Sequence, residues 1–382
     1  MVANIIEHFK DLADPRRNQH LVLHKLIDIV VIAVCATLAQ QDTWEEIADY
    51  AEMKEDFLKR FLELPNGIPS HDTMSRVFSL IEPTSWQVCF ASWMKAMGKL
   101  SGEKLIAIDG KTLRGSKATG TGKRDKEQAA LELVSAWASE SELVLAHLAV
   151  KDKSNEITIL PELLELLDLE GATVTLDAMG TQRDIAEQII EQGGDYLLTL
   201  KANHGKIYEE ASWLFNYNLE QQVTMAQTET FDVKHGRQET RTCWLMDDFS
   251  YLYSTDCNLE AWKNLAAIVV VESTTLRQGK AHRDRRFFLT SLTENAAPLL
   301  ERVRKHWSIE NQQHYPLDVT FNEDRNRTRK GFAAQNLAAL RRLALNLLNL
   351  DDDRKRSKRR KRLKALLDDA YLLHLLGIPL DA

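Results

Sequence analysis

The stretch LIAIDG, residues 105–110, is where the sequence changes from a helical to a strand-like pattern. Its apolar residues predict a short buried strand, which Asp109 and Gly110 end. A second apolar run at 172–176 ends in the same way at Asp177. A carboxylate at the end of a buried strand lies where the chain leaves the core, so both aspartates are candidate functional residues.

The segments around these strands indicate the fold class. Residues 131–138 and 143–150 are strand-like and are joined by a turn. Two amphipathic helical patterns follow, one opening at Pro161 and the other spanning 181–192, and they alternate with further strands, the last at 196–201. The order β-β-β-α-β-α-β predicts an α/β fold in which helices flank a mixed sheet.

The regions outside this core have patterns of their own. The first hundred residues read as helical, with helix starts expected at Thr43 and Ser70. Alternating segments after residue 205 predict a β-rich insertion, and a long helical region with a break at Gly331 follows it. We therefore expect a helical domain at 1–100, a mixed α/β domain at 101–350 with its insertion at 205–295, and a basic segment with a C-terminal helix at 351–382.

The composition excludes several classes of protein. The four cysteines form no CxxC pair, so neither a disulfide framework nor a structural zinc site is expected. The longest apolar stretch, 26–39, contains Asp28 and is shorter than the roughly 20 residues that a membrane helix needs. The first residues show no signal-peptide pattern, and we expect a cytoplasmic protein.

The net charge of −7 argues at first sight against a nucleic-acid partner. The basic residues are concentrated, however, because nine of the eleven residues from Arg354 to Lys364 are lysine or arginine. Such a stripe can bind phosphates locally whatever the total charge, and Arg359 and Arg360 are its expected contacts. The alternative is a disordered run that keeps the protein in solution.

Asp109 and Asp177 could share a pair of hard cations at one edge of the sheet. Mg²⁺ prefers oxygen ligands and keeps some of its water, so two or three carboxylates plus substrate phosphates suffice. Two ions about 3.5–4 Å apart can activate an attacking oxygen and stabilise a leaving one. For either aspartate alone, a helix cap or a turn is an equally good interpretation. The pair is stronger evidence, since the expected sheet brings both strand ends together.

A third carboxylate is expected in the helical region after the insertion. Glu310 lies in the segment HWSIENQQH (306–314), where His306 and His314 are four residues away on either side and share its helix face. This spacing also fits a His/Glu transition-metal site, although such histidines more often make hydrogen bonds or phosphate contacts. Glu323 and Asp324 are rival candidates for the third position.

Several ordered motifs, spread over nearly the whole chain, resemble those of one family. They are IAIDGKTLRGS (106–116), KSNEI (153–157), TLDAMGTQ (175–182), DYLLTLKANH (195–204), HGRQETR (235–241), HWSIEN (306–311), LDVTFNEDRNRTRKG (317–331) and NLAALRRLALNLL (336–348). In this combination the chain resembles the H-repeat-associated transposases of the DDE superfamily. The segment PSHDTMSRVF (69–78) resembles the helical domain associated with them.

The resemblance implies an RNase H-like catalytic core with a β insertion before its last acidic residue. It implies that Asp109, Asp177 and Glu310 are the three metal-binding acids and hold two Mg²⁺ ions, for which Mn²⁺ can substitute. The implied activity is DNA transposition: double-stranded DNA is cut at the transposon ends, and the released 3′-hydroxyl attacks target DNA. Both ends must be held together, so a homodimer on DNA is expected.

Basic side chains near the motifs would contact the phosphate backbone, namely Lys111, Arg114, Lys201 and Arg237. In related transposases a tyrosine and an arginine precede the glutamate by seven and four residues, and a lysine follows seven later. Here those positions hold Val303, His306 and Leu317, so His306 is expected to take the place of the arginine. Pro316 is expected to bias Tyr315 away from helical geometry and to kink the helix.

Two other functions remain open from the sequence. One is a DNA-binding transposase remnant that no longer transposes. The other is a different RNase H-like nuclease, which would cut DNA without joining strands. Only cleavage and joining assays separate them from an active transposase.

Overall fold

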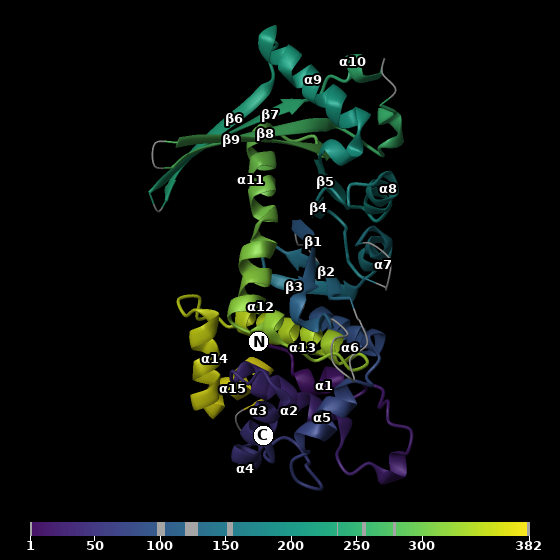
Figure 1. Ribbon diagram of the computed structural model, residues 1–382, viewed down its shortest axis with the longest axis vertical. Coiled ribbons are helices and arrows are strands. Elements are labelled where there is room, and N and C mark those ends of the chain that lie inside the picture. Colours follow the sequence, from purple (N-terminus) through teal and green to yellow (C-terminus); the bar gives the residue numbers. More distant parts are fainter. Residues whose placement is uncertain are drawn as a thin grey trace.

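A computed structural model of the chain describes residues 2–97, 104–118, 129–150, 156–234, 236–253, 257–277 and 280–379. The molecule is elongated, with helices at one end, a sheet through its middle, and α9 and α10 at the far end (Figure 1). The strands of the described residues form one sheet, in the order β3-β2-β1-β4-β5-β9-β8-β7-β6. Among these residues no helix combines the length and hydropathy that crossing a membrane requires.

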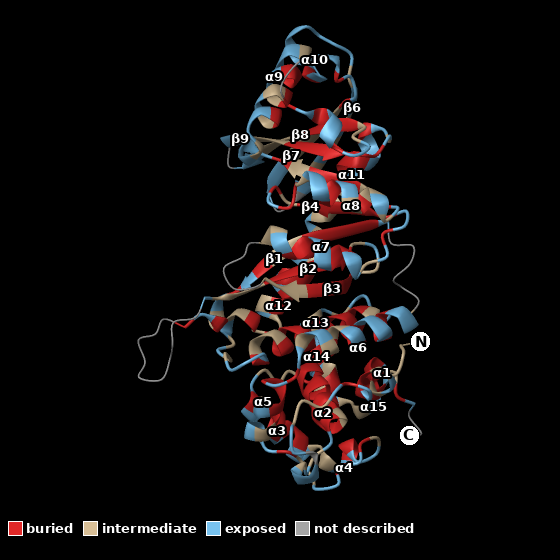
Figure 2. Cartoon of the chain, turned by 90° about the vertical axis from the view of Figure 1, so that its right-hand side faces the viewer, coloured by how far each residue is buried: buried red, intermediate tan, exposed pale blue. Residues whose placement is uncertain are grey.

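The N-terminal helices begin where the sequence predicts. Thr43 and Glu46 form a capping box at the start of α3, and the Ser70 hydroxyl accepts a hydrogen bond from the Thr73 amide at the start of α5. The apolar run at 26–38 is a helix buried on almost every side, as Figure 2 shows, which explains its composition. The helices are α1 (Ile5–Phe9), α2 (Leu26–Leu38), α3 (Trp44–Met53), α4 (Glu55–Leu58), α5 (His71–Phe78) and α6 (Pro83–Ala96).

The first five strands form the mixed core that the sequence predicts. They are β1 (Leu105–Leu113), β2 (Leu131–Ala138), β3 (Leu143–Ala149), β4 (Thr173–Leu176) and β5 (Asp195–Leu200). The first three are antiparallel neighbours, and β1, β4 and β5 run parallel. Helices α7 (Leu160–Glu165) and α8 (Arg183–Glu191) lie on one side of these strands, and α11 (Ala296–His306) lies on the other (Figure 1). The α/β prediction is confirmed.

The strand β1 continues past the point where the sequence predicts its end. Pairing with β2 runs from Ile106 to Leu113, whereas pairing with β4 stops at Ile108. The prediction that Asp109 ends its strand is therefore wrong, because β2 continues the backbone ladder beyond it. On the β4 side Ile108 is level with Leu176, so the residues after them, Asp109 and Asp177, leave the parallel pair together.

The insertion is β-rich, as expected, and it extends the central sheet. Its elements are α9 (Lys206–Glu220), β6 (Ala226–Lys234), β7 (Arg237–Met246), α10 (Ser250–Tyr253), β8 (Ala267–Arg277) and β9 (Lys280–Thr290). The last strand, β9, pairs antiparallel with β5, from Leu197 opposite Thr290 to Leu200 opposite Phe287. The sequence pattern does not predict this pairing, which is made between residues about 90 positions apart.

The helical region after the insertion contains an irregular turn. It consists of α11, a π-helix at Ile309–His314, α12 (Tyr315–Val319) and α13 (Ala333–Leu350). Gly331, with φ +51°, breaks the region as predicted. The expectation for Tyr315 is wrong, because its φ of −58° and ψ of −48° are helical. Pro316 stands in the first turn of α12, where a missing N–H costs no helix hydrogen bond.

The basic run at 354–364 is partly structural. It enters α14 (Lys358–Leu367), which packs with α2, α13 and α15 (Asp369–Leu376). Lys361 and Arg362 are buried; Lys361 Nζ lies 3.0 Å from Asp351 and Arg362 lies 2.9 Å from Asp42. The interpretation of the whole run as a phosphate-binding stripe, or as a disordered one, is corrected: these two charges hold helices together.

Candidate functional site

Three carboxylates from distant parts of the chain line one cleft. Asp109 comes from β1, Asp177 follows β4, and Glu310 comes from the π-helix on the α11 side. The cleft has a volume of about 530 Å³, and Lys201, Arg286 and Trp307 also line it. The sheet register explains the first two positions, and the passage of the chain from α11 into the π-helix explains the third.

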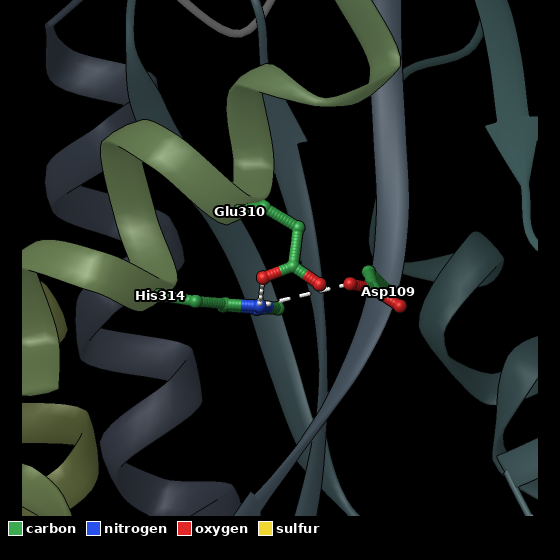
Figure 3. A group of neighbouring side chains, drawn as sticks. All are labelled: Asp109, Glu310 and His314. Atoms are coloured by element: carbon green, nitrogen blue, oxygen red, sulfur yellow. Dashed lines mark hydrogen bonds and ion pairs between the residues drawn. The ribbon is translucent and has the colours of Figure 1, made fainter. Parts of the chain in front are cut away.

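Asp109, Glu310 and His314 form the tightest group in this cleft. Each offers a ligand atom, and these atoms all lie within 4.8 Å of one another. His314 Nδ1 is 3.4 Å from Glu310 Oε2 and 3.6 Å from Asp109 Oδ2, as Figure 3 shows. The imidazole is buried, and its Nε2 has no hydrogen-bond partner among the described residues. The sequence spacing offers His314 as a member of a His/Glu transition-metal site, beside the more common role of such histidines in hydrogen bonds or phosphate contacts.

The electrostatics of the group are those of acids held close together. Burial, together with the nearby Glu310 and Asp177 carboxylates, raises the pKa of Asp109 to about 7, against a hydrogen bond from the Gly110 amide that lowers it. The His314 hydrogen bond lowers the pKa of Glu310. The site therefore favours binding of positive charge.

Asp177 has two roles that the sequence could not separate. Its Oδ1 accepts hydrogen bonds from the amides of Met179, at 2.9 Å, and Gly180, at 3.2 Å, so it does shape the turn after β4. Among the described residues no hydrogen bond is made to its other oxygen, Oδ2. Since Asp177 also lines the cleft, that oxygen is available to a ligand.

These donors fit a divalent cation. Carboxylate oxygens are the ligands that Mg²⁺ and Mn²⁺ prefer, and one imidazole is acceptable to Mn²⁺. The buried His314 side chain beside two carboxylates, with one ring nitrogen unpaired, supports the same conclusion. The geometry also separates Glu310 from its rivals. Glu323 is fully buried against Arg342, at 2.9 Å, and lies outside this group.

Glu156 is a site neighbour that the sequence reasoning missed. It begins a 3₁₀ turn, η3 (Glu156–Ile159), just before α7. Burial, together with the neighbouring acids Glu132, Asp177 and Asp109, raises its pKa to about 8. In the sequence, Glu156 is distinguished only by its position in the motif KSNEI. The first three residues of that motif lie outside the described part of the chain.

Two expected phosphate contacts are corrected by the structure. Lys111 is buried, and its Nζ lies 2.7 Å from Asp318, 3.4 Å from Asp324 and 3.7 Å from Glu323. Those acids already neutralise its charge, so it is not available to DNA. His306 lines the cleft, but burial lowers its pKa to about 4, and its Nδ1 is 2.8 Å from the Thr175 hydroxyl. A neutral imidazole cannot supply the charge of the arginine that it was expected to replace.

The other expected contacts are exposed. Lys201 lies in the cleft, and Arg237 lines a neighbouring groove between β7, β8, β9 and α11. Arg114 is 84% exposed and lines a basic hollow with Lys117, Arg325, Arg327 and Arg329. Arg359 and Arg360 are exposed on α14, at the helical end of the molecule (Figure 1).

Two basic residues of the cleft, Arg285 and Arg286, were not predicted. The Arg286 guanidinium stands 5.1 Å from the Trp307 ring centre, over its face, and both residues line the cleft and the neighbouring groove. Arg286 is one of four basic residues close together in β9. The sequence cannot show which of them faces the acids, because that depends on the pairing of β9 with β5.

Comparisons with known proteins identify the family of the chain. Residues 6–94 match the family model described as DDE_Tnp_1-associated, and residues 100–347 match the one described as transposase DDE domain. The chain is 36% identical over 382 residues to "Putative transposase YncI" of Escherichia coli O157:H7, covering 98% of this chain and 95% of that one. It is 36% identical over 377 residues to "H repeat-associated putative transposase YhhI" of Escherichia coli strain K12, with 98% and 97% covered.

A solved structure, the piggyBac transposase synaptic complex with hairpin DNA, is similar over 98% of this chain and 80% of that chain, with a TM-score of 0.43 and 11% identity. The family assignment rests on the sequence matches. Because the transposase DDE domain covers well over half of the chain and these relatives are similar over nearly all of it, the chain belongs to the DDE-domain transposases, among the H-repeat-associated members.

Proposed function

We propose that the protein is an active DNA transposase, which cuts double-stranded DNA at transposon ends and joins the released ends to target DNA. The observation that carries the proposal is the approach of Asp109, Glu310 and His314 to within 4.8 Å, in a cleft that Asp177 also lines. Among the described residues no lysine or arginine forms an ion pair with Asp109, Asp177 or Glu310, and a divalent cation explains why these acids are held so close.

Asp109, Asp177 and Glu310 would hold two divalent cations, Mg²⁺ or Mn²⁺. When bound, these would lower the pKa of the attacking hydroxyl group and offset the charge that builds up on the phosphorus. The charges of Asp177 and Glu310 both act on Asp109, since each of these carboxylates raises its pKa. Lys201 and Arg286 would hold the scissile phosphate in place, and Trp307 would exclude water from one wall of the cleft.

The groove beside the cleft supports a DNA path. It holds Arg237, Arg241 and Arg304, which pair with Glu239 or Asp232, and Arg237 and Arg304, unlike the buried Lys111, remain exposed. The groove meets the cleft at Arg286 and Trp307. A row of arginines that leads to the acids would follow a phosphate backbone. We expect two copies of the chain to act together, because two transposon ends must meet in one reaction.

The test is a cleavage and joining assay on labelled DNA that contains the flanks of the gene, with Mg²⁺, with Mn²⁺ and with a chelator. We expect metal-dependent nicks followed by joined products. Asp177→Asn should abolish both while leaving DNA affinity unchanged or higher, because it removes a charge from the acids and keeps the turn acceptor. Full cleavage by this variant would remove Asp177 from the site.

The same assay separates the two alternatives. A folded protein that binds the DNA but never nicks it would be a remnant. Nicking without joined products would indicate a nuclease of another kind.

A further inference from the structure

Glu156 lies against β1 on the side opposite Glu310. It begins η3, which leads into α7, and Figure 1 shows α7 on one side of the central strands and α11 on the other. The chain segments that carry Glu156 and Glu310 therefore adjoin helices on different sides of the central strands. Neither the predicted strands nor the assignment of Asp109, Asp177 and Glu310 as the metal-binding acids gives Glu156 a function.

Gly110 makes room for this carboxylate. Successive residues of a strand point to opposite faces, and Asp109 points toward Glu310 and His314. Position 110 consequently faces η3. A Cβ atom on Gly110 would overlap Oε1 and Cδ of Glu156, so the Glu156 carboxylate occupies the space that any other side chain at 110 would fill. This brings it beside the backbone of the residue that follows Asp109.

No positive charge balances Glu156 in the part of the chain that the structure describes. No lysine or arginine there forms an ion pair with it, and its charged neighbours are Glu132, Asp177 and Asp109. It shares a hydrogen bond with Glu132. A partly buried carboxylate among acids is costly unless a cation or a proton neutralises it.

We propose that Glu156 is a fourth carboxylate of the metal centre and binds a divalent cation together with Asp109 and Asp177. The inference rests on the proposed function and deepens it. Mg²⁺ and Mn²⁺ take six ligands, mostly oxygen, and a fourth carboxylate supplies one on the side of β1 that Glu310 does not reach. Glycine at 110 is then a requirement of the site, because it admits the Glu156 side chain.

The experiment measures Mn²⁺ binding to the full chain without DNA, by the loss of the free-ion signal in electron paramagnetic resonance, together with thermal unfolding in chelator and in Mn²⁺. Glu156→Gln keeps the shape and removes the charge. We expect it to weaken Mn²⁺ binding about tenfold or more, because even the hydrogen-bonding partners of metal ligands typically contribute that much to metal affinity. In chelator its Tm should equal or exceed that of the wild type, because a repulsion is gone.

Two further variants make the result specific. Gly110→Ala leaves Glu156 charged but displaces its carboxylate, so it should weaken Mn²⁺ binding in the same way. Glu165→Gln makes the same chemical change on an exposed residue of α7 and should bind Mn²⁺ like the wild type.

Other outcomes would overturn the inference. Wild-type Mn²⁺ affinity in Glu156→Gln would do so, as would a Tm lowered equally with and without Mn²⁺, which is the mark of a structural role. Should Asp109→Asn lose Mn²⁺ while Glu156→Gln retains it, the proposed metal centre stands and Glu156 lies outside it. Absence of Mn²⁺ binding to the wild-type chain, with or without added DNA, counts against both proposals.

Discussion

Two groups of acidic side chains lie along β1, and they differ in what faces them. Asp109 and Lys111 are two residues apart in the strand and therefore share a face. Around Asp109 the neighbours are other acids and His314. Around Lys111 the acids are paired with basic partners, through Asp318, Asp324 and the buried pair of Glu323 with Arg342.

The difference shows that the number of acids in a region does not mark a metal centre. Both groups come from the same strand and the same helical region, and Glu323 is the more deeply buried of the two candidate glutamates. What separates them is the counter-charge. Acids that the protein neutralises with its own lysine and arginine support the fold. Acids without such partners can bind an external cation instead.

The largest expected effect tests the neutralised group. Glu323→Ala leaves Arg342 buried without its partner, because both side chains are fully inaccessible. We expect the free energy of unfolding to fall by about 3–5 kcal/mol, as for other buried pairs that lose one member. Urea denaturation measures it, with Asp324→Ala, a partly exposed partner of Lys111, as the milder control. A loss no greater than that control would mean that Glu323 does not carry the structure.

The second prediction has the opposite sign and concerns the unneutralised group. In chelator, Asp109→Asn should raise the free energy of unfolding, by on the order of 1 kcal/mol at pH 8. The folded pKa of about 7 lies above the value near 4 of an unfolded aspartate, so the folded chain binds the proton more tightly. Stability is therefore lost as the pH rises from about 4 through 7, and the variant should gain least at pH 4.

The control for this prediction is the same pair of curves in Mn²⁺. The wild type should then recover stability that Asp109→Asn does not. A variant less stable than the wild type in chelator at every pH would show that Asp109 is a structural residue.

Much of this arrangement follows from sequence patterns. The alternation of short apolar runs with amphipathic segments predicts the mixed sheet, and the capping residues Thr43 and Ser70 predict two helix starts. Asp109 and Asp177 stand out because each follows a buried run, and the parallel register then brings them level. These are local patterns, so they can be recognised in a single sequence.

Most of the features that the sequence did not predict depend on pairing between distant residues. The sequence predicts an unpaired Lys111, whereas in the structure α12 and the turn after it bring acids to this side chain. Pairing of β9 with β5 joins the insertion to the core. Glu156 occupies the space that a side chain at position 110 would fill, and it belongs to a turn that follows two further strands after β1. The π-helix that carries Glu310 has no distinctive composition.

The third prediction uses pH to test the burial of His147 beside Arg342. Burial holds the pKa of His147 well below its usual value, and the nearby Arg342 guanidinium lowers it further. An unfolded histidine takes up a proton near pH 6.5 and the folded one does not, so stability is present above that pH and lost below it. We expect a slope of about 1.4 kcal/mol per pH unit between pH 6 and 5 from this one group. His147→Gln should lose that slope in denaturation curves, and an unchanged slope would contradict the assignment.

The smallest expected effect lies between the two groups, at Pro316. The sequence suggests that proline strains this helix, in which case Pro316→Ala should stabilise the protein. In the structure Pro316 fits the first turn of α12, and Tyr315 before it is helical. Alanine would then mainly free the unfolded chain and lower the free energy of unfolding by about 0.4–1 kcal/mol. Urea denaturation gives the sign. A stabilised variant would mean that the turn joining Glu310 to Asp318 is held under strain, and the two groups would then be coupled through the backbone.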